Sequence, residues 1–259
     1  MLAHSLFLLF LFASPSLGFI EDDPDHVHED YDFPDDDEGH HHHLMVPSEA
    51  HAVGDFLRHY SDLGGGISKE LMVARNIDGD TMLHLAARAG DVASLDLMLA
   101  NGANPNIGGG SRNLTTPLHQ AMATSPRDSY LTATSLVNGG AKVNALDNDE
   151  SRRTPLHLAA AYGNAHTASL LITHGANLEA KDGMGMTPLF HAVFGDSLEA
   201  VKLLLERGAN ARARDHRNLT PVDVATHPGR AGSKNARAIA SVLNSGYGQQ
   251  YASSYHDEL

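Results

Sequence analysis

The chain has 259 residues, of which 42% are hydrophobic, and a formal net charge of −14 at pH 7. This length permits one or two domains with a sizeable core. The negative charge argues against a nucleic-acid surface, because phosphate binding needs a basic face. The absence of cysteine excludes disulfides, thiol redox chemistry and zinc sites with cysteine ligands.

Residues 1–18 are predicted to be a secretory signal peptide. Residues 6–13, LFLLFLFA, form an apolar run too short for a membrane span, which needs about 20 residues. The small residues Ser16 and Gly18 suit cleavage after Gly18, although no Lys or Arg precedes the apolar run. The alternative, a buried hydrophobic helix, would place the acidic tract that begins at Glu21 beside a core. No other segment approaches the length of a membrane span, so we expect none in the mature protein.

Residues 19–47 are predicted to be a disordered acidic and histidine-rich segment. Its central part, residues 21–43, holds 11 Asp and Glu and six His but no Lys or Arg, a composition typical of a solvated segment without a core. The same side chains suit weak binding of Ca²⁺, or of Zn²⁺ by the histidine cluster. No EF-hand loop fits, because Pro34 falls where a ligand would be needed. Metal binding stays an open alternative for this segment.

Residues 48–75 are predicted to form an N-terminal helical cap. A helix with one apolar face comes first, and the helix-breaking residues 64–66, GGG, separate it from a second segment that runs from Ile67 to Arg75. The apolar face consists of Val53, Phe56, Leu57, Tyr60 and Leu63. We interpret the segment as a cap because an array of repeats follows it, and such an array needs closed ends.

Residues 76–246 contain five tandem copies of one pattern. A block similar to Thr-Pro-Leu-His marks each copy, and its threonine recurs at spacings of 35, 38, 33 and 33 residues. A Gly-Ala block follows 21 residues after the threonine in the first, third and fourth copies and 24 residues after it in the second. Such periodicity indicates a stack of units, each with too little core to stand alone. The threonines are Thr81, Thr116, Thr154, Thr187 and Thr220.

This pattern resembles the ankyrin repeat, which has a period of about 33 residues and a Thr-Pro-Leu-His signature. The best copy, RRTPLHLAAAYGNAHTASLLITHGANLEA, begins at Arg152. The resemblance covers residues 76–246. It implies an all-α fold, the ankyrin-repeat solenoid, in which paired antiparallel helices are joined by β-hairpin-like fingers and stacked into a curved array.

The residues also give physical reasons for each helix. Thr154 can cap the first helix of its repeat, and Pro155 suits the first helical position because it has a preset φ and no N–H to lose. Gly175 follows the second helix, where a left-handed residue is needed. The predicted caps of the second helices are Asp91, Asn164 and Ser197.

The fifth repeat contains five extra residues, but Asn235 can still cap a helix that places Ile239, Val242 and Leu243 inward and stops at Gly246. Residues 247–259 are predicted to be a flexible tail. It ends in the tetrapeptide His-Asp-Glu-Leu, which is a receptor-read signal for retention in the endoplasmic reticulum. Together with the signal peptide, this tail predicts a protein of the endoplasmic reticulum lumen. The retention residues are His256, Asp257, Glu258 and Leu259.

No set of residues indicates catalysis, a cofactor or a metal site in the repeats. The GDSL string at residues 195–198 lacks the strand and helix around an esterase nucleophile, so we interpret it as coincidence. In the first three repeats a histidine follows each threonine by three residues, and the resemblance implies that it ties helix and finger together rather than binding metal. Phe190 and Asp223 replace this histidine in the last two repeats and put that hydrogen bond in doubt. The three histidines are His84, His119 and His157.

Two N-glycosylation sequons occur, at Asn113 and Asn218. Both are expected in fingers just before a first helix, so both are expected to be exposed. The hydroxyl residue of the second sequon, Thr220, is also the predicted helix cap. Addition of a glycan to Asn218 would therefore have to precede folding.

We predict a non-catalytic scaffold that binds another protein in the endoplasmic reticulum lumen. The resemblance implies a concave surface built from finger and first-helix positions, and Tyr, Met, Phe and Arg are enriched in interfaces. The alternative is a lumenal Ca²⁺- or Zn²⁺-binding or chaperone-like protein that acts through its acidic segment. From the columns one and three places before each threonine and seven or eight after it, the predicted binding residues are Asp78, Asp80, Arg88, Asn113, Thr115, Ser151, Arg153, Tyr162, Met184, Met186, Phe194 and Arg217.

Overall fold

The computed structural model divides into two compact units, residues 1–42 and 43–259, and every described residue belongs to the second unit. The predicted signal peptide, the acidic segment, the sequon at Asn113 and the C-terminal tail lie outside the described residues, as does most of the predicted cap helix. The structure describes residues 53–55, 57, 69–109, 115–147, 150–230 and 232–245.

The described residues form helices joined by loops, without a sheet. Isolated β-bridges, between Arg75 and Thr81 and between Gly109 and Thr115, are the β-structure found in these ranges. None of the helices in them is long and apolar enough to span a membrane. The helices are α3 (Lys69–Val73), α4 (Met82–Ala89), α5 (Val92–Ala100), α6 (Pro117–Gln120), α7 (Pro126–Asn138), α8 (Pro155–Ala161), α9 (Ala165–Thr173), α10 (Pro188–Phe194), α11 (Leu198–Glu206), α12 (Pro221–Ala225) and α13 (Ala236–Asn244), with 3-10 turns η2 (Ala121–Ala123) and η3 (Pro228–Arg230).

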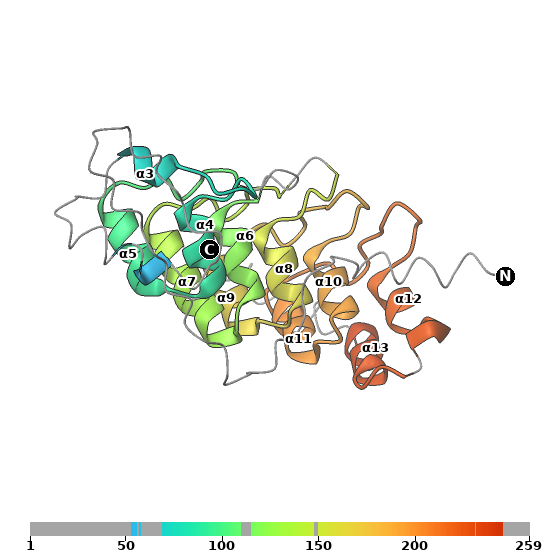
Figure 1. Ribbon diagram of the computed structural model, residues 1–259. Helices are drawn as coiled ribbons and strands as arrows, with labels where there is room; N and C mark the ends of the chain where they lie inside the picture. The colour runs from blue at the N-terminus through green and yellow to red at the C-terminus, as the bar shows by residue number, and fades with distance from the viewer. Residues whose placement is uncertain are drawn as a thin grey trace, which may run out of the picture. The chain divides into compact units, whose positions relative to one another are not determined.

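Each repeat contributes a short first helix and a second helix that packs against it. The first helices α4, α6, α8, α10 and α12 stack on one another in chain order, and so do the second helices α5, α7, α9, α11 and α13. Figure 1 shows these two rows and the loops that connect each second helix to the next first helix. We call these loops fingers and number each by the repeat that it precedes. The all-α ankyrin-type architecture predicted from the sequence is therefore confirmed.

The ends of the helices follow the predicted backbone chemistry. Thr154 lies before α8 in an extended conformation with φ −89° and ψ 164°, and Pro155 occupies the first helical position. Beyond α9, Gly175 has φ +84°, a left-handed conformation that costs a residue with a Cβ about 1 kcal/mol or more. The corresponding glycines after α5, α7 and α11 share this geometry, with φ between 88° and 92°. Glycine at this column therefore lets the chain turn from the second helix into the finger.

A continuous apolar core runs through the stack. A leucine two residues after the threonine is 1% exposed or less in each of the first four repeats, and small alanines beside it let the neighbouring helix approach. In the predicted N-terminal cap, Val53 and Leu57 are also buried, while the other three residues of its apolar face lie outside the described residues. The four leucines are Leu83, Leu118, Leu156 and Leu189.

The predicted cap residues of the second helices lie at the N-cap positions, but two of them make no side-chain capping bond. Asp91 and Ser197 accept a hydrogen bond from a backbone N–H of the helix that follows. Asn164 does not, and its buried amide nitrogen donates to the Met122 carbonyl, 3.2 Å away in the preceding repeat. Asn235 likewise donates to the Asp196 carbonyl at 2.8 Å. An amide can donate as well as accept, so these two side chains bind a neighbouring repeat rather than their own helix.

Candidate functional site

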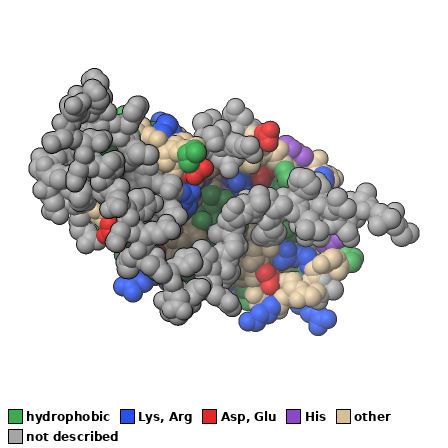
Figure 2. Space-filling view, viewed as in Figure 1, with side chains coloured by type: hydrophobic (Ala, Val, Ile, Leu, Met, Phe, Trp, Pro, Cys, Tyr) green, Lys and Arg blue, Asp and Glu red, His purple; other side chains and the backbone are tan. Residues whose placement is uncertain are grey.

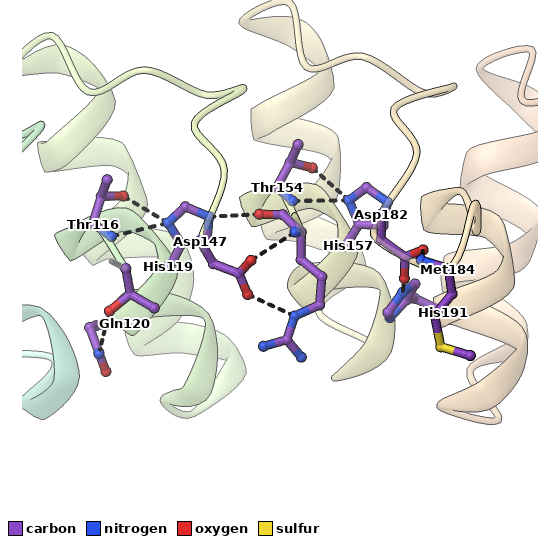
Figure 3. Close-up of polar contacts among 11 residues, drawn as sticks. Thr116, His119, Gln120, Asp147, Thr154, His157, Asp182, Met184 and His191 are labelled. Carbon is purple, nitrogen blue, oxygen red and sulfur yellow. Dashed lines mark hydrogen bonds and ion pairs between the residues drawn. The ribbon is translucent and has the colours of Figure 1, made fainter. Parts of the chain in front are cut away.

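Three buried histidines connect successive repeats. In each case the backbone N–H of the threonine donates to Nδ1 of the histidine three residues later, at 3.3, 3.2 and 3.1 Å. A nitrogen that accepts from an N–H cannot carry a proton, so the proton lies on Nε2. The Nε2–H donates to the carbonyl of Thr115, Arg153 or Met186, at 3.0, 3.1 and 3.1 Å. Figure 3 shows the bonds of His119 and His157 to their threonines, and the bond from His119 to the next finger.

The acceptor carbonyls identify what the histidines join. Each belongs to the finger of the following repeat, so the helix-to-finger bond implied by the family resemblance is confirmed, and it crosses between repeats. Burial lowers the pKa of His84, His119 and His157, that of His157 to about 4 with a further contribution from the charge of His191. These imidazoles are therefore neutral at pH 7, with both ring nitrogens in use. Within the described ranges, no group of three or more His, Asp or Glu is placed to hold a metal ion.

Buried carboxylates hold the fingers in shape. In finger 4, Asp182 Oδ1 accepts from the N–H groups of Met184 and Met186, both at 2.8 Å. Asp215 Oδ1 plays the same part in finger 5, where it accepts from Arg217 and Leu219, both at 2.9 Å. The amide oxygen of Asn76 accepts from two N–H groups of finger 1 in the same way. Each finger with this arrangement is closed by one side chain that satisfies two backbone donors.

The link between repeats 4 and 5 is different. Phe190 is fully buried and carries no polar atom that could reach finger 5. The next residue, His191, places Nε2 2.9 Å from Asp182 Oδ2 and lies edge-on to the His157 ring, with centroids 5.1 Å apart. Burial raises the pKa of Asp182, but the hydrogen bonds from His191, Met186 and Met184 outweigh it and bring this pKa below its ordinary value. Figure 3 shows this cluster at the base of finger 4.

The fifth repeat replaces the histidine by Asp223. Its carboxylate accepts from the Thr220 backbone N–H at 2.8 Å and from the Thr220 hydroxyl at 2.6 Å, and these bonds lower the pKa of Asp223. The carboxylate therefore keeps the cap of the first helix. The sequence puts the histidine's hydrogen bond to the finger in doubt for repeats 4 and 5. In the described ranges, neither Phe190 nor Asp223 makes a hydrogen bond to a following finger.

The predicted binding residues differ widely in exposure. Tyr162, at the end of α8, has 52% of its surface exposed, whereas Asp80 and Met186 are 3% and 0% exposed and cannot present their side chains to a partner. Asn113 lies outside the described residues. Among the others, Asp78, Arg88 and Arg217 are exposed, and the half-buried ones are Thr115, Ser151, Arg153, Met184 and Phe194.

Three of the predicted arginines are tied to aspartates. Arg153 Nε lies 2.8 Å from Asp147 Oδ2. Arg88 and Arg217 each lie 3.2 Å from a carboxylate oxygen, the former from Asp80 and the latter from Asp215. These arginines therefore shape the fingers and the first helix of repeat 1 as well as facing outward. By contrast, α8 and α10 pack side by side and bring Tyr162 and Phe194 to the same end of the first-helix row.

The sequence reasoning missed three exposed cations, Lys181, Arg212 and Arg214. They lie in fingers 4 and 5 but outside the columns chosen from the threonine. The run ARARDHR at residues 211–217 was the available signal, because it is the most basic stretch of the repeats. Figure 2 shows Lys and Arg side chains scattered among Asp and Glu on the described part of the surface that faces the viewer.

The comparisons with known proteins agree with this architecture. Residues 78–109 match the family model for the ankyrin repeat, and residues 127–215 match the model for three copies of it. An ankyrin repeat protein of fowlpox virus is 34% identical over 103 residues, which are 39% of this chain and 29% of the viral protein. The ankyrin repeat and LEM domain-containing protein 1 homolog of Caenorhabditis elegans is 40% identical over 79 residues, 30% of this chain and 11% of that protein.

A longer match joins the chain to the E3 ubiquitin-protein ligase KEG of Arabidopsis thaliana, with 27% identity over 174 residues, 66% of this chain and 10% of the ligase. The chain thus spans less than a third of the length of each of these relatives. Residues 78–109 and 127–215 of this chain form ankyrin repeats, and the descriptions of the viral and the nematode relative also name them.

Proposed function

We propose that this protein is a non-catalytic ankyrin-repeat scaffold that binds another protein in the lumen of the endoplasmic reticulum. The relatives have quite different names, two of which mention ankyrin repeats, and in each the match covers a minor part of the whole. This distribution supports a role for the repeats as an interaction module. The match to the ligase covers 10% of that protein and does not carry its activity over.

The observation that carries the proposal is the exposure of Tyr162 at the end of a first helix. Among the described aromatic side chains, Tyr162 has 52% of its surface exposed and Tyr130 has 40%. Tyr is enriched at interfaces because its ring is apolar and its hydroxyl polar. Phe194 lies at the equivalent end of α10, and Met184 lies in finger 4, both half-buried. These three side chains form the proposed first-helix surface.

Replacing Tyr162, Met184 and Phe194 together by Ala tests this surface. Affinity capture from a lumenal extract should lose the partner, while the melting temperature stays within a few degrees because none of the three is fully buried. A matched control replaces Tyr130 and Leu131 of α7, each 40% exposed, which lie on a second helix. Unchanged recovery with the triple variant would refute the proposed surface.

The proposed location rests on the two ends of the given sequence, the apolar residues 6–13 and the His-Asp-Glu-Leu tetrapeptide. A retention receptor would then be a second partner, through residues 256–259. Expression of the chain ending at Tyr255 in eukaryotic cells should move the protein into the medium, while the full chain stays inside. Retention of the shortened chain would contradict the location.

Glycosylation of Asn113 and Asn218 belongs to the same proposal. Asn218 is exposed in finger 5 with φ +66°, and Thr220 of its sequon is held by Asp223 in the folded chain. We expect modification of Asn218 before α12 folds. The variants Asn218→Gln and Asn113→Gln should each remove one step of the mobility shift caused by endoglycosidase. An unshifted wild-type chain would show that neither sequon is used.

The second candidate function is ion binding or chaperone-like action by the acidic segment, and the 11 carboxylates and six histidines of residues 21–43 favour it. Deletion of these residues separates the two candidates. Partner capture by the repeats should survive the deletion. Heat from Ca²⁺ or Zn²⁺ in isothermal titration of the full chain, if it disappears in the deleted chain, would support the second candidate.

A further inference from the structure

Fingers 4 and 5, residues 177–186 and 210–219, carry a group of exposed cations. Lys181, Arg212 and Arg214 are exposed, and the Arg217 side chain retains 45% of its surface. Lys181 Nζ lies 3.4 Å from the Arg214 carbonyl, so the group extends across both fingers. The two fingers are also joined by their backbones, because the His216 N–H donates to the Met184 carbonyl at 3.0 Å. We call these four cations the basic finger surface.

The carboxylates of these fingers compensate the cations only in part, by the ion pair of Asp215 with Arg217 at 3.2 Å. Asp182 and Asp215 are buried, 7% and 6% exposed, and accept hydrogen bonds from the backbones of their own fingers. Glu179 Oε1 accepts from the Asn210 N–H at 2.8 Å. Among the ion pairs of the described ranges, none includes Lys181, Arg212 or Arg214. The positive charge of this surface is therefore only partly compensated by the protein itself.

The pKa of one acidic side chain, Asp223, responds to the charge of this surface. The charge of Arg214 contributes to the lowered pKa of Asp223, after the larger effect of the hydrogen bonds from Thr220. The charge of Arg214 thus stabilises the ionised Asp223 carboxylate, but Oδ2 of that carboxylate already accepts hydrogen bonds from the Thr220 backbone N–H and hydroxyl. It offsets one of the four charges in part.

Three of these cations also take part in bonds of the fingers themselves: Arg214 Nη1 donates to the Asn218 carbonyl at 2.8 Å, Lys181 Nζ donates to the Arg214 carbonyl, and Arg217 pairs with Asp215. The repeat framework does not require the charge of Arg212. The residues at the column of Arg212 are Glu179 in finger 4 and Asn144 in finger 3, and Leu146 of finger 3 lies at the column of Lys181 and Arg214. Asn144 bonds the next repeat through its amide, to the Gly175 carbonyl and the Asn177 N–H, whereas the Arg212 side chain makes no hydrogen bond with any residue in the described ranges. Its exposed charge has no counterpart in the architecture.

We propose that the basic finger surface binds an acidic segment of the partner protein. Guanidinium groups bind carboxylates with two parallel hydrogen bonds, which makes arginine suited to such a segment, and complementary charge speeds encounter and selects the partner. A short acidic polypeptide segment is favoured over a nucleic acid because these cations are confined to two fingers, whereas the phosphate contacts of a nucleic acid need an extended basic face. This inference rests on the proposed protein-binding function and names the chemistry of the partner.

The test uses the full chain and a labelled ten-residue peptide of alternating Glu and Ser, followed by fluorescence anisotropy at low salt. The double variant Lys181→Glu and Arg212→Glu should bind the peptide at least about fivefold more weakly, because two attractive exposed charges become repulsive. The control Arg127→Glu and Arg237→Glu makes the same change in net charge at exposed residues of α7 and α13 and should change binding less than about twofold. A peptide of alternating Gln and Ser should not bind.

Three results would overturn the inference: no binding of the acidic peptide to the full chain, equal weakening by the test and control variants, or equally tight binding of a thymidylate oligonucleotide of the same charge. If the test variant loses helix content, the pair Lys181→Gln and Arg212→Gln takes its place. Loss of partner capture in the Tyr162, Met184 and Phe194 variant is a separate readout. Should that loss occur without peptide binding, the scaffold function stands and the basic finger surface does not.

Discussion

At the scale of single residues, the buried histidines of the first three repeats each make two hydrogen bonds to backbone groups. His157 accepts from the Thr154 N–H through one ring nitrogen and donates to the Met186 carbonyl through the other. A buried polar group that loses its partner costs about 1–3 kcal/mol. One imidazole therefore protects two backbone groups, which belong to two different repeats.

Replacement of His157 by Ala should lower the free energy of unfolding by about 3 kcal/mol, because it leaves the Thr154 N–H and the Met186 carbonyl unpaired and opens a cavity. Urea unfolding followed by circular dichroism measures the change. The exposed His166 of α9 supplies the control, and His166→Ala should change stability by less than about 0.5 kcal/mol. Similar losses in both variants would contradict the connecting role of His157.

The hydrogen bond between each histidine and its threonine could be predicted from the sequence. Which repeat supplies the finger that accepts from the other ring nitrogen could not. Thr-Pro-Leu-His fixes the short hydrogen bond to the threonine because only three residues separate the two side chains. The other bond depends on which finger lies under the helix after stacking, and this is a tertiary property. The pair formed by His191 and Asp182 was missed for the same reason, since nothing in the sequence marks two residues nine apart as partners until the finger folds back.

At the scale of elements, the end of the array is held by a loop rather than by a histidine. Asp196, between α10 and α11, accepts from the Ser233 hydroxyl and from the Asn235 N–H at 3.1 Å, and Arg230 lies 3.5 Å from its carboxylate. Asp196 has φ +54° at the column where Gly163 has φ +71°. An aspartate tolerates this left-handed backbone, and its side chain fastens the inserted residues of repeat 5 to repeat 4.

The conservative substitution Asp196→Asn should loosen repeat 5 while it preserves the left-handed turn. We expect a local loss of about 1–2 kcal/mol, because the amide cannot accept at both of its terminal atoms. Hydrogen exchange should become faster in α12 and α13 and stay unchanged in α4 and α5. Faster exchange throughout the array, or none at all, would argue against this attachment.

The boundaries of the elements were predictable where one residue type has one use. Threonine followed by proline, and glycine after the second helix, have strict backbone roles, and the structure places them as expected. The positions of Asn164 and Asn235 at the helix starts were predicted, but the partners of their side chains were not, because an amide can also donate and each amide nitrogen bonds a carbonyl of a neighbouring repeat. The fingers likewise contain isolated bridges where hairpins were expected.

At the scale of the whole molecule, the buried neutral histidines make stability depend on pH. His157 has a pKa of about 4 in the folded chain, whereas an unfolded histidine titrates near about 6.5. Between these values the unfolded chain binds more protons, so the free energy of unfolding rises with pH. His84 and His119, whose pKa values are also lowered by burial, act in the same direction. Asp182 has a pKa below its ordinary 3.8, and its contribution is lost only at still lower pH.

We therefore expect full stability above about pH 6.5 and a progressive loss as the pH falls toward about 4, of roughly 3 kcal/mol from His157 alone. Urea unfolding at a series of pH values measures this dependence, and the slope should be smaller in His157→Gln. A profile that is flat between these limits, or a variant with the wild-type slope, would contradict the burial of neutral imidazoles.

The forward donation of the Nε2 proton gives the array a direction. The acceptor of this hydrogen bond belongs to the following repeat. During synthesis, the imidazole Nε2–H of a repeat therefore lacks its acceptor until the next finger has been made. The fourth repeat does not depend on the next finger in this way, because Phe190, which replaces the histidine, is buried and has no hydrogen-bond donor in its side chain. In a chain shortened after repeat 4, each of the three repeat histidines would keep its acceptor in the next finger. In a chain shortened after repeat 3, the Nε2–H of His157 would lose its acceptor, the Met186 carbonyl. In the described ranges, the fourth repeat is thus the point where the array can end without leaving a repeat histidine short of its acceptor in the next finger.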